Sequence, residues 1–330
     1  MHLRTENIEA FLRVVEMGSI SGAARRMSLS KSVISKRLTE LEHGMEVRLL
    51  YRSTRMVQPT EAGRQFYESA RGAMNCLWDA AESLARHPQG PCGELRVVAP
   101  TCLGVRWLSA MAADFAERLP RVELVFDLDD SAADVDVRRY DVGVLVGRLG
   151  DSWSIARRLA VSRRVLCCSP GYAARNALPR SPEDLDRHAC LSRVGAAPGF
   201  GREGDSARAA QGASRRYVTG SEDVLRDAAL RGLGLAVLPL YAIADDLAGA
   251  RLVEVVPGWR PADEPIHAVY PRESARSPKV KAFVQHLQEA LAQPPWERVA
   301  TAAIPVQRHA GGGTLSVLPP AAVCAEAKAR

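Results

Sequence analysis

A change in hydrophobic periodicity near residue 90 constrains the fold of this chain more than any other feature. Before that point apolar residues recur at the spacing of a helix, first as Ile8, Phe11, Leu12 and Val15. After it, short β-rich runs alternate with helical segments, which is typical of α/β folds. A chain of 330 residues is long enough for two or three domains with their own cores. We therefore expect a helical N-terminal region followed by a larger α/β region.

Three helices are predicted at the N-terminal end. The first ends at Gly18, and a short second helix with Ser21 as its candidate N-cap follows. A tight turn at residues 28–30 leads to a third helix over residues 31–43, which has one apolar face and one small, polar and basic face. This order of elements predicts a helix-turn-helix.

Two short strands complete this N-terminal domain, for which we expect the bounds 1–59. They lie at residues 47–50 and 56–58 and are joined by a charged turn, and Pro59 closes the pair. A β-hairpin in this place is the wing of a winged helix-turn-helix.

A long helix is predicted over residues 60–87, with Thr60 as its N-cap and a Pro- and Gly-rich break after it. Apolar residues along it alternate spacings of four and three, as in the seam of a coiled coil. They are Phe66, Ala70, Ala73, Leu77, Ala80 and Leu84. The pattern predicts a linker helix that dimerises, and the alternative is a helix packed on its own domain.

Residues 93–293 carry the alternating pattern of an α/β domain, from a first strand at 95–99 to a last helix at 279–292. Beyond residue 293 the composition turns to Ala, Pro and Gly, and three glycines are consecutive at 311–313. We expect residues 294–330 to be a largely disordered tail.

The N-terminal domain concentrates positive charge. Five basic residues and no acid lie between positions 25 and 37, and the wing adds Arg48, Arg52 and Arg55. Such a surface is suited to DNA phosphates, and the polar face of the third helix is suited to a major groove. The residues expected to face bases are Lys31, Ser32, Ser35 and Lys36. The alternative is an ordinary solvated helix face.

Residues in this domain resemble the N-terminal signature of the LysR-type transcriptional regulators. They are Phe11, Gly18-Ser19, Ala23-Ala24, Ser30, Val33, Ser35, Leu41-Glu42, Arg52 and Thr60-Glu61-Ala62-Gly63. The resemblance covers about 60 residues densely and continues more loosely to residue 293. Two departures stand out, because Glu46 replaces the usual glycine after the third helix and Leu50 replaces the usual wing phenylalanine.

The resemblance, together with the charge pattern, predicts a DNA-binding surface on the second and third helices and the wing. Its members are Arg25, Arg26, Ser30, Lys31, Ser32, Ser35, Lys36, Arg37, Arg52 and Arg55. Two-fold symmetry of a dimer would match a dyad-symmetric site on double-stranded DNA.

The resemblance also implies that the α/β region is a two-lobed effector-binding domain with the fold of periplasmic solute-binding proteins. Its expected lobes are residues 93–161 with 266–293, and residues 162–265. Ligands of open α/β sheets bind at strand carboxyl ends beside helix N-termini. The predicted effector-binding residues are Thr101, Cys102, Leu145, Gly147 and Ser221.

Within this predicted site, Thr101 is the best candidate to bind a ligand carboxylate, with Ser221 opposite it. Both are equally well explained as helix N-caps. One branch of the family resembles this chain at Asp130, Asp134, Asp141, Ser169-Pro170, Tyr172, Gly232-Leu233-Gly234 and Pro239. That branch usually carries an arginine where this chain has Leu145.

Other classes of function find less support. The sequence contains no G-x-S-x-G, Walker loop or H-E-x-x-H, and Gly232-Leu233-Gly234 lies after a helix, so it predicts a C-cap rather than a dinucleotide loop. A cysteine redox switch is a second alternative, because Cys167 and Cys168 are adjacent and Cys102 lies near the predicted site. A solute-binding protein would not explain residues 1–60.

Cofactors, location and partners follow from the same features. The seven cysteines lack metal-site spacing, so we expect no cofactor and no metal. No apolar stretch is long enough to span a membrane and the N-terminus lacks the core of a signal peptide, which predicts a cytoplasmic protein. Expected partners are DNA, a small organic effector and further copies of the chain as a dimer or tetramer. RNA polymerase is a further candidate partner.

Overall fold

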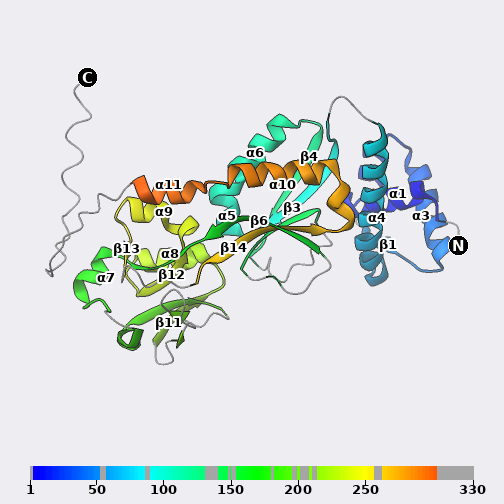
Figure 1. Ribbon diagram of the computed structural model, residues 1–330. Coiled ribbons are helices and arrows are strands. Elements are labelled where there is room, and N and C mark those ends of the chain that lie inside the picture. Colours follow the sequence, from blue (N-terminus) through cyan, green and yellow to red (C-terminus); the bar gives the residue numbers. More distant parts are fainter. Residues whose placement is uncertain are drawn as a thin grey trace, which may run out of the picture.

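The computed structural model arranges the chain as an elongated molecule with three parts (Figure 1). A helical N-terminal domain and the long helix α4 lie at one end, and two sheets with their helices follow. The structure describes residues 3–52, 57–85, 90–130, 140–147, 149, 154–179, 182–194, 199–200, 208–209, 214–255 and 262–302.

Three helices and a hairpin form the N-terminal domain. Their bounds are α1 Thr5–Met17, α2 Ile20–Arg26, α3 Lys31–Met45, β1 Leu50–Arg52 and β2 Val57–Pro59. The core contains Phe11, Ile34 and Leu38, each at most 1% exposed, because apolar residues at helical spacing place one face of α1 against one face of α3. Ser19 rather than Ser21 caps α2, since its side chain accepts a hydrogen bond from the Gly22 N–H at 3.3 Å.

The corner between α3 and the wing depends on the backbone of Glu46 and the side chain of Glu42. Glu46 ends α3 in a left-handed conformation, φ 55°, where the resemblance led us to expect a glycine. The Glu42 carboxylate accepts hydrogen bonds from the N–H groups of Leu49 and Leu50, at 2.9 and 3.1 Å. These bonds fix the start of the hairpin, whose strands pair antiparallel.

The long helix α4, Glu61–Ala85, begins as predicted after Thr60, whose hydroxyl accepts from the Gly63 N–H at 2.9 Å. Its early seam residues pack on the N-terminal domain, with Phe66 against Phe11 at 5.5 Å between ring centroids and Ala70 buried. Later, Ala73 is exposed and Leu77 is 54% exposed. The early part of α4 therefore packs on its own domain, whereas Ala73 and Leu77 are accessible. The side chains of Ala80 and Leu84 lie outside the described residues.

The first sheet, lobe I, has the strand order β4-β3-β5-β14-β6. The strands are β3 Gly93–Ala99, β4 Val122–Leu128, β5 Val142–Val146, β6 Ser154–Ser162 and β14 Glu264–Pro271. Strand β3 pairs parallel with β4 and β5, whereas β14 runs antiparallel to β5 and β6. The associated helices are α5 Thr101–Leu103, the π-helical turn η1 Gly104–Leu108, α6 Ser109–Arg118, η4 Glu273–Arg276 and α10 Pro278–Ala290.

The second sheet, lobe II, has the strand order β11-β8-β12-β7-β13. The strands are β7 Arg164–Cys168, β8 Ala189–Arg193, β11 Ser214–Thr219, β12 Leu235–Pro239 and β13 Val253–Glu254. Its helices are α7 Pro170–Arg175, η3 Pro182–Arg187, α8 Glu222–Leu230 and α9 Leu240–Ala248, and a small hairpin pairs β9 Gly199–Phe200 with β10 Arg208–Ala209. One hydrophobic core continues from lobe I into lobe II.

The sequence-based prediction of a disordered tail over residues 294–330 places the start of that tail too early. Residues Pro295–Ala302 form a further helix, α11, which packs on α9. Its Trp296 is completely buried and contacts Trp107 of lobe I and Tyr241 of lobe II, with ring centroids at 5.7 and 6.0 Å. Burial of a single large side chain orders this short helix, although the composition beyond residue 293 suggested disorder. Residues 303–330 lie outside the described part.

Candidate nucleic-acid and ligand surfaces

The outer face of α3 carries the residues predicted to face bases. Ser30 caps the helix by accepting from the Val33 N–H at 3.3 Å, and its hydroxyl lies 2.8 Å from that of Ser32. Lys31 and Ser32 are exposed, and the Lys36 side chain is 78% exposed. Ser35 is half-buried. The structure therefore brings these residues together on one accessible helix face.

Two predicted DNA-binding arginines are already paired inside the chain. Arg37 on α3 forms an ion pair with Glu6 on α1 at 3.2 Å, and its side chain is 21% exposed. Arg26 at the end of α2 forms an ion pair with Glu123 on β4 of lobe I. Arg25 is exposed and has no ion pair within the described residues. The pattern of charges along the sequence did not distinguish these three arginines.

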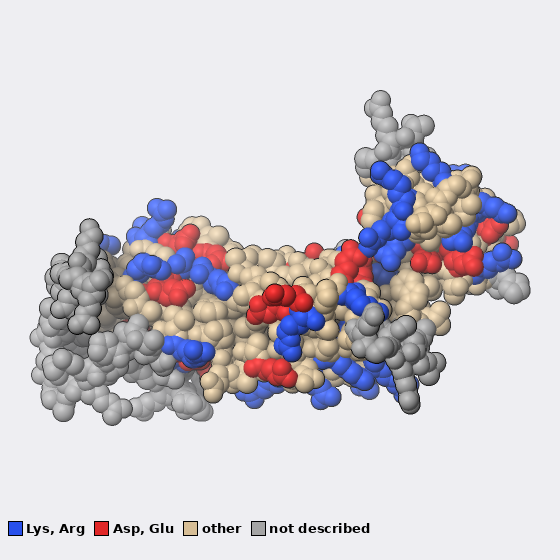
Figure 2. Space-filling view, turned by 90° about the horizontal axis from the view of Figure 1, so that it is seen from above, with Lys and Arg blue, Asp and Glu red and all other residues tan. Residues whose placement is uncertain are grey.

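The wing is described in part. Arg52 pairs through its backbone with Val57 in the hairpin, while its side chain and the whole of Arg55 lie outside the described residues. Figure 2 shows Lys and Arg side chains spread over the end of the molecule that contains α1–α4. Exposed basic residues of this end include Arg25, Arg26, Lys31, Lys36 and Arg48.

The first turn after β3 contains the predicted carboxylate-binding residue. The Thr101 N–H donates to the Asp130 carboxylate at 2.9 Å, so an acidic side chain of the protein occupies the position expected for a ligand carboxylate. Thr101 is the first residue of α5, Cys102 is 2% exposed, and Leu145 on β5 is 7% exposed. Gly147 follows β5 with a φ of 101°.

An ion pair connects the two lobes beside these residues. Arg106 on η1 donates to the Asp223 carboxylate of α8 through Nη2 at 2.7 Å and Nε at 3.3 Å. Burial raises the pKa of the Cys102 thiol, and the guanidinium of Arg106 opposes that rise. Sequence reasoning did not find Arg106, because its partner lies 117 residues away and no local pattern links the two.

The start of α8 contains a buried carboxyl group. Ser221 is the N-cap by position, but its side chain makes no capping hydrogen bond. Glu222 is 8% exposed, accepts from the Tyr241 hydroxyl at 2.7 Å and lies 3.4 Å from Arg193. Burial raises the pKa of Glu222, and the Tyr241 and Arg193 contacts oppose that rise. The two helix starts predicted to bind an anion are thus flanked by acids.

Cys102, Cys167, Cys168 and Cys190 have the environment of buried hydrophobic residues. Burial raises the pKa of the Cys102 thiol to about 12 and that of Cys168 to about 11, and it also raises the pKa of Cys167. Thiolates are the reactive form, so these thiols are held in the unreactive one. Cys167 and Cys168 contribute to different core clusters from the same strand.

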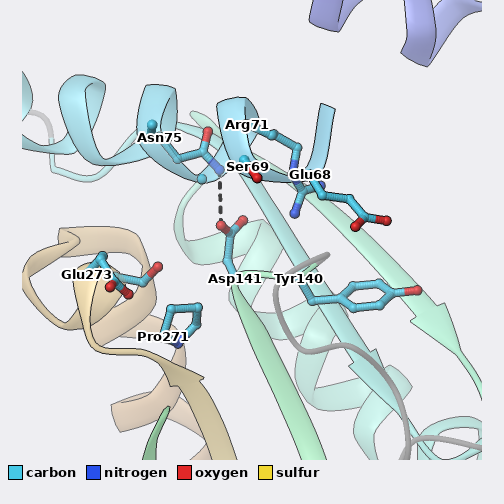
Figure 3. Close-up of a pocket in the computed structure, with 11 residues that line it drawn as sticks. Glu68, Ser69, Arg71, Asn75, Tyr140, Asp141, Pro271 and Glu273 are labelled. Atoms are coloured by element: carbon cyan, nitrogen blue, oxygen red, sulfur yellow. Dashed lines mark hydrogen bonds between the residues drawn. The ribbon is translucent and has the colours of Figure 1, made fainter. Parts of the chain in front are cut away.

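A cavity of about 470 Å³ lies where α4 meets lobe I. Figure 3 shows side chains from α4, from the residues just before β5 and from the end of β14 facing it. Asp141 is 5% exposed and accepts from Asn75 of α4 at 3.1 Å and from the Arg96 N–H at 2.8 Å. The predicted effector residues do not line this cavity. Asp141 therefore ties the linker helix to lobe I.

In the described part of the chain, no group of three or more His, Cys, Asp or Glu side chains is arranged to hold a metal ion. None of the helices described there is both long and apolar enough to cross a membrane.

Comparison with protein families identifies the two regions. A model of the LysR substrate binding domain matches residues 88–292, and a model of bacterial regulatory helix-turn-helix proteins of the lysR family matches residues 5–64. The HTH-type transcriptional regulator PtxR of Pseudomonas aeruginosa is 32% identical over 89% of this chain and 95% of its own. CrgA of Neisseria meningitidis serogroup C is 31% identical over 88% of this chain and 98% of its own.

Solved structures agree with this identification. The structure of CrgA from Neisseria meningitidis, described as a LysR-type transcriptional regulator, has a TM-score of 0.56 at 29% identity, over 88% of this chain and 99% of that one. Full-length AphB from Vibrio cholerae, described as a virulence activator, has a TM-score of 0.56 at 25% identity, over 88% of this chain and 100% of that one.

Fold and matches together define a transcriptional regulator with a helix-turn-helix and an effector-binding domain. The chain belongs to the LysR family. The sequence-based predictions of family, fold class and regulatory function are confirmed.

Proposed function

We propose that α3 reads bases in the major groove while residues of α2 and the wing bind phosphates. The main observation in support of this proposal is that Lys31, Ser32 and Lys36 are exposed together on one face of the N-terminal half of α3. In helix-turn-helix proteins this part of the recognition helix contacts base edges. Arg25 and Arg52 supply phosphate contacts in this proposal, and Arg37 orients α3 through its ion pair with Glu6 on α1.

Replacing Lys36 with alanine tests the base contact. We expect Lys36→Ala to weaken binding to a selected site about tenfold relative to random DNA, because a base contact contributes about 1–3 kcal/mol of discrimination. Arg52→Ala should weaken binding to both DNAs and reduce the slope of log affinity against log salt by about one. Titrations over a salt series measure both effects, and equal losses on site and random DNA for both variants would contradict the assignment.

We infer that a small organic effector binds at the junction between the lobes, where Thr101, Cys102, Leu145, Gly147 and Ser221 were predicted to lie. The Arg106–Asp223 ion pair supports this proposal, because it connects the two lobes and contains a guanidinium that an anionic ligand could bind. A ligand that takes over Arg106 would release Asp223 and so favour a different arrangement of the lobes. In this scheme the ion pair is the element that the effector breaks.

The variant Asp223→Asn tests this scheme with benzoate as the anionic probe. Removal of the competing carboxylate should tighten benzoate binding about tenfold, as expected for one charged hydrogen bond gained. Asp227→Asn is the matched control, because Asp227 is also on α8 but pairs with Arg226. Calorimetric titration measures the affinities, and an equal response of the two variants would contradict a role of Arg106 in ligand binding.

The protein in this proposal acts as a cytoplasmic homo-oligomer without a catalytic step. The exposed Ala73 and Leu77 of α4 support self-association through the later part of that helix, because the earlier part is covered by the N-terminal domain. A symmetric dimer presents two copies of α3 to a dyad-symmetric DNA site. RNA polymerase is proposed as a further partner.

A further inference from the structure

The side chain of Val33 is an apolar group on the otherwise polar face of α3. It is the third residue of the helix and is 37% exposed. Lys31, Ser32 and Lys36 around it are exposed and polar, whereas the next residue, Ile34, is completely buried. The core side of α3 is therefore complete without Val33.

The conformation of Val33 is fixed before any partner binds. The Ser30 hydroxyl accepts from the Val33 N–H at 3.3 Å, so the capping bond holds this residue in the first turn. A β-branched side chain in a helix has one strongly preferred rotamer. The two methyl groups of Val33 thus lose little freedom when they make a contact, which favours recognition by shape.

We propose that Val33 contacts the C5 methyl group of a thymine and makes α3 select that base at one position of each half-site. This inference rests on the proposed entry of α3 into the major groove. Thymine is the unmodified base that presents a methyl group there, and side chains with methyl groups recognise it by apolar contact. The cations at positions 31 and 36 bind hydrogen-bond acceptors, so they cannot detect the methyl group itself.

The size of the effect follows from the area of one methyl group. Removing one methyl or methylene group from water contributes about 0.8 kcal/mol to the free energy of binding, which corresponds to about a fourfold change in affinity. Uracil differs from thymine only by lacking this methyl group and keeps the same pairing. Substitution of uracil for thymine therefore isolates the contact without changing any hydrogen bond.

The experiment uses the full chain and a DNA site selected from a random library. Each thymine of that site is replaced in turn by deoxyuridine, and dissociation constants are measured for the unmodified protein, Val33→Ala and Val47→Ala. Val47 is the matched control, because it is 42% exposed but lies after α3. We expect uracil at one thymine of each half-site to weaken binding by the unmodified protein and by Val47→Ala about fourfold, and to leave Val33→Ala unchanged.

The outcomes separate this inference from the DNA-binding proposal. If the unmodified protein selects no site over random DNA, the proposed entry of α3 is wrong and the inference about Val33 fails with it. If a site is selected but Val33→Ala shows the same uracil penalties as the unmodified protein, the thymine contact alone is overturned. The thymine contact is supported if Val33→Ala loses the uracil penalty at one thymine of each half-site while the unmodified protein and Val47→Ala keep it.

Discussion

The face of α3 and the junction between the lobes differ in what already binds their polar groups. On α3, Lys31 has no ion pair within the described residues, and the ion pair of Lys36 with Glu40 is 3.9 Å long. At the junction, the Thr101 N–H is bound to Asp130 and Arg106 is bound to Asp223. The first surface is available to an anionic partner, whereas the second has to exchange internal contacts for a ligand.

The two surfaces also differ in how far they depend on distant parts of the chain. The α3 face comes from helical spacing within one segment, and the cap of that segment lies next to it. The junction depends on pairs separated by 29 and 117 residues. We therefore expect substitutions to reduce the free energy of unfolding most where a contact joins distant segments and least where the geometry is local. The following variants test that ranking.

The largest loss of stability is expected from Trp296→Ala. Trp296 is completely buried and joins α11 to residues of both lobes. Substitution of a buried tryptophan by alanine costs about 4 kcal/mol of stability, because the transfer free energy is lost and a cavity remains. Urea unfolding of the full chain, with hydrogen exchange of α9 and α11 peptides, measures the loss. Trp78→Ala is the control, since Trp78 is 37% exposed, and similar losses in both variants would contradict the ranking.

A smaller loss is expected from Gly63→Ala. A Cβ at Gly63 would lie 2.0 Å from the Leu49 carbonyl oxygen, which is backbone and cannot move aside. Overpacking of this kind costs about 3 kcal/mol, and hydrogen exchange should assign the loss to α1–α4. Gly72→Ala on the same helix has no atom within 4 Å of its new Cβ and should gain about 0.5 kcal/mol from helix propensity. Unchanged stability of Gly63→Ala would disprove the close approach of α4 to the wing.

The smallest effect, a gain, is expected from Glu46→Gly. Glu46 holds the left-handed conformation at the end of α3, which costs a residue with a Cβ about 1 kcal/mol and costs glycine almost nothing. Urea unfolding should therefore show stabilisation by about 1 kcal/mol. Glu46→Ala keeps the Cβ and should leave stability unchanged, so equal gains in both variants would assign the effect to charge instead of backbone conformation.

Expectations drawn from the sequence succeeded where neighbouring residues decide the structure. Helical spacing predicted α3, and the alternation of short β-rich and helical segments after residue 90 predicted the α/β region. They failed for the end of the effector domain, because α11 is ordered by Trp296 through contacts with residues far away in the sequence. They also treated Arg26 and Arg37 as equivalent to Arg25, although the first two have internal carboxylate partners.

The family, the winged helix-turn-helix and the polar face of α3 could be predicted from the amino-acid sequence, since they depend on periodicity and on residue types a few positions apart. The pairing of charged groups was found in the folded structure alone, for Arg106 with Asp223 between the lobes and for Arg26 with Glu123 between the domains. An ion pair requires two side chains within a few ångströms, and folding sets that distance independently of their separation along the chain.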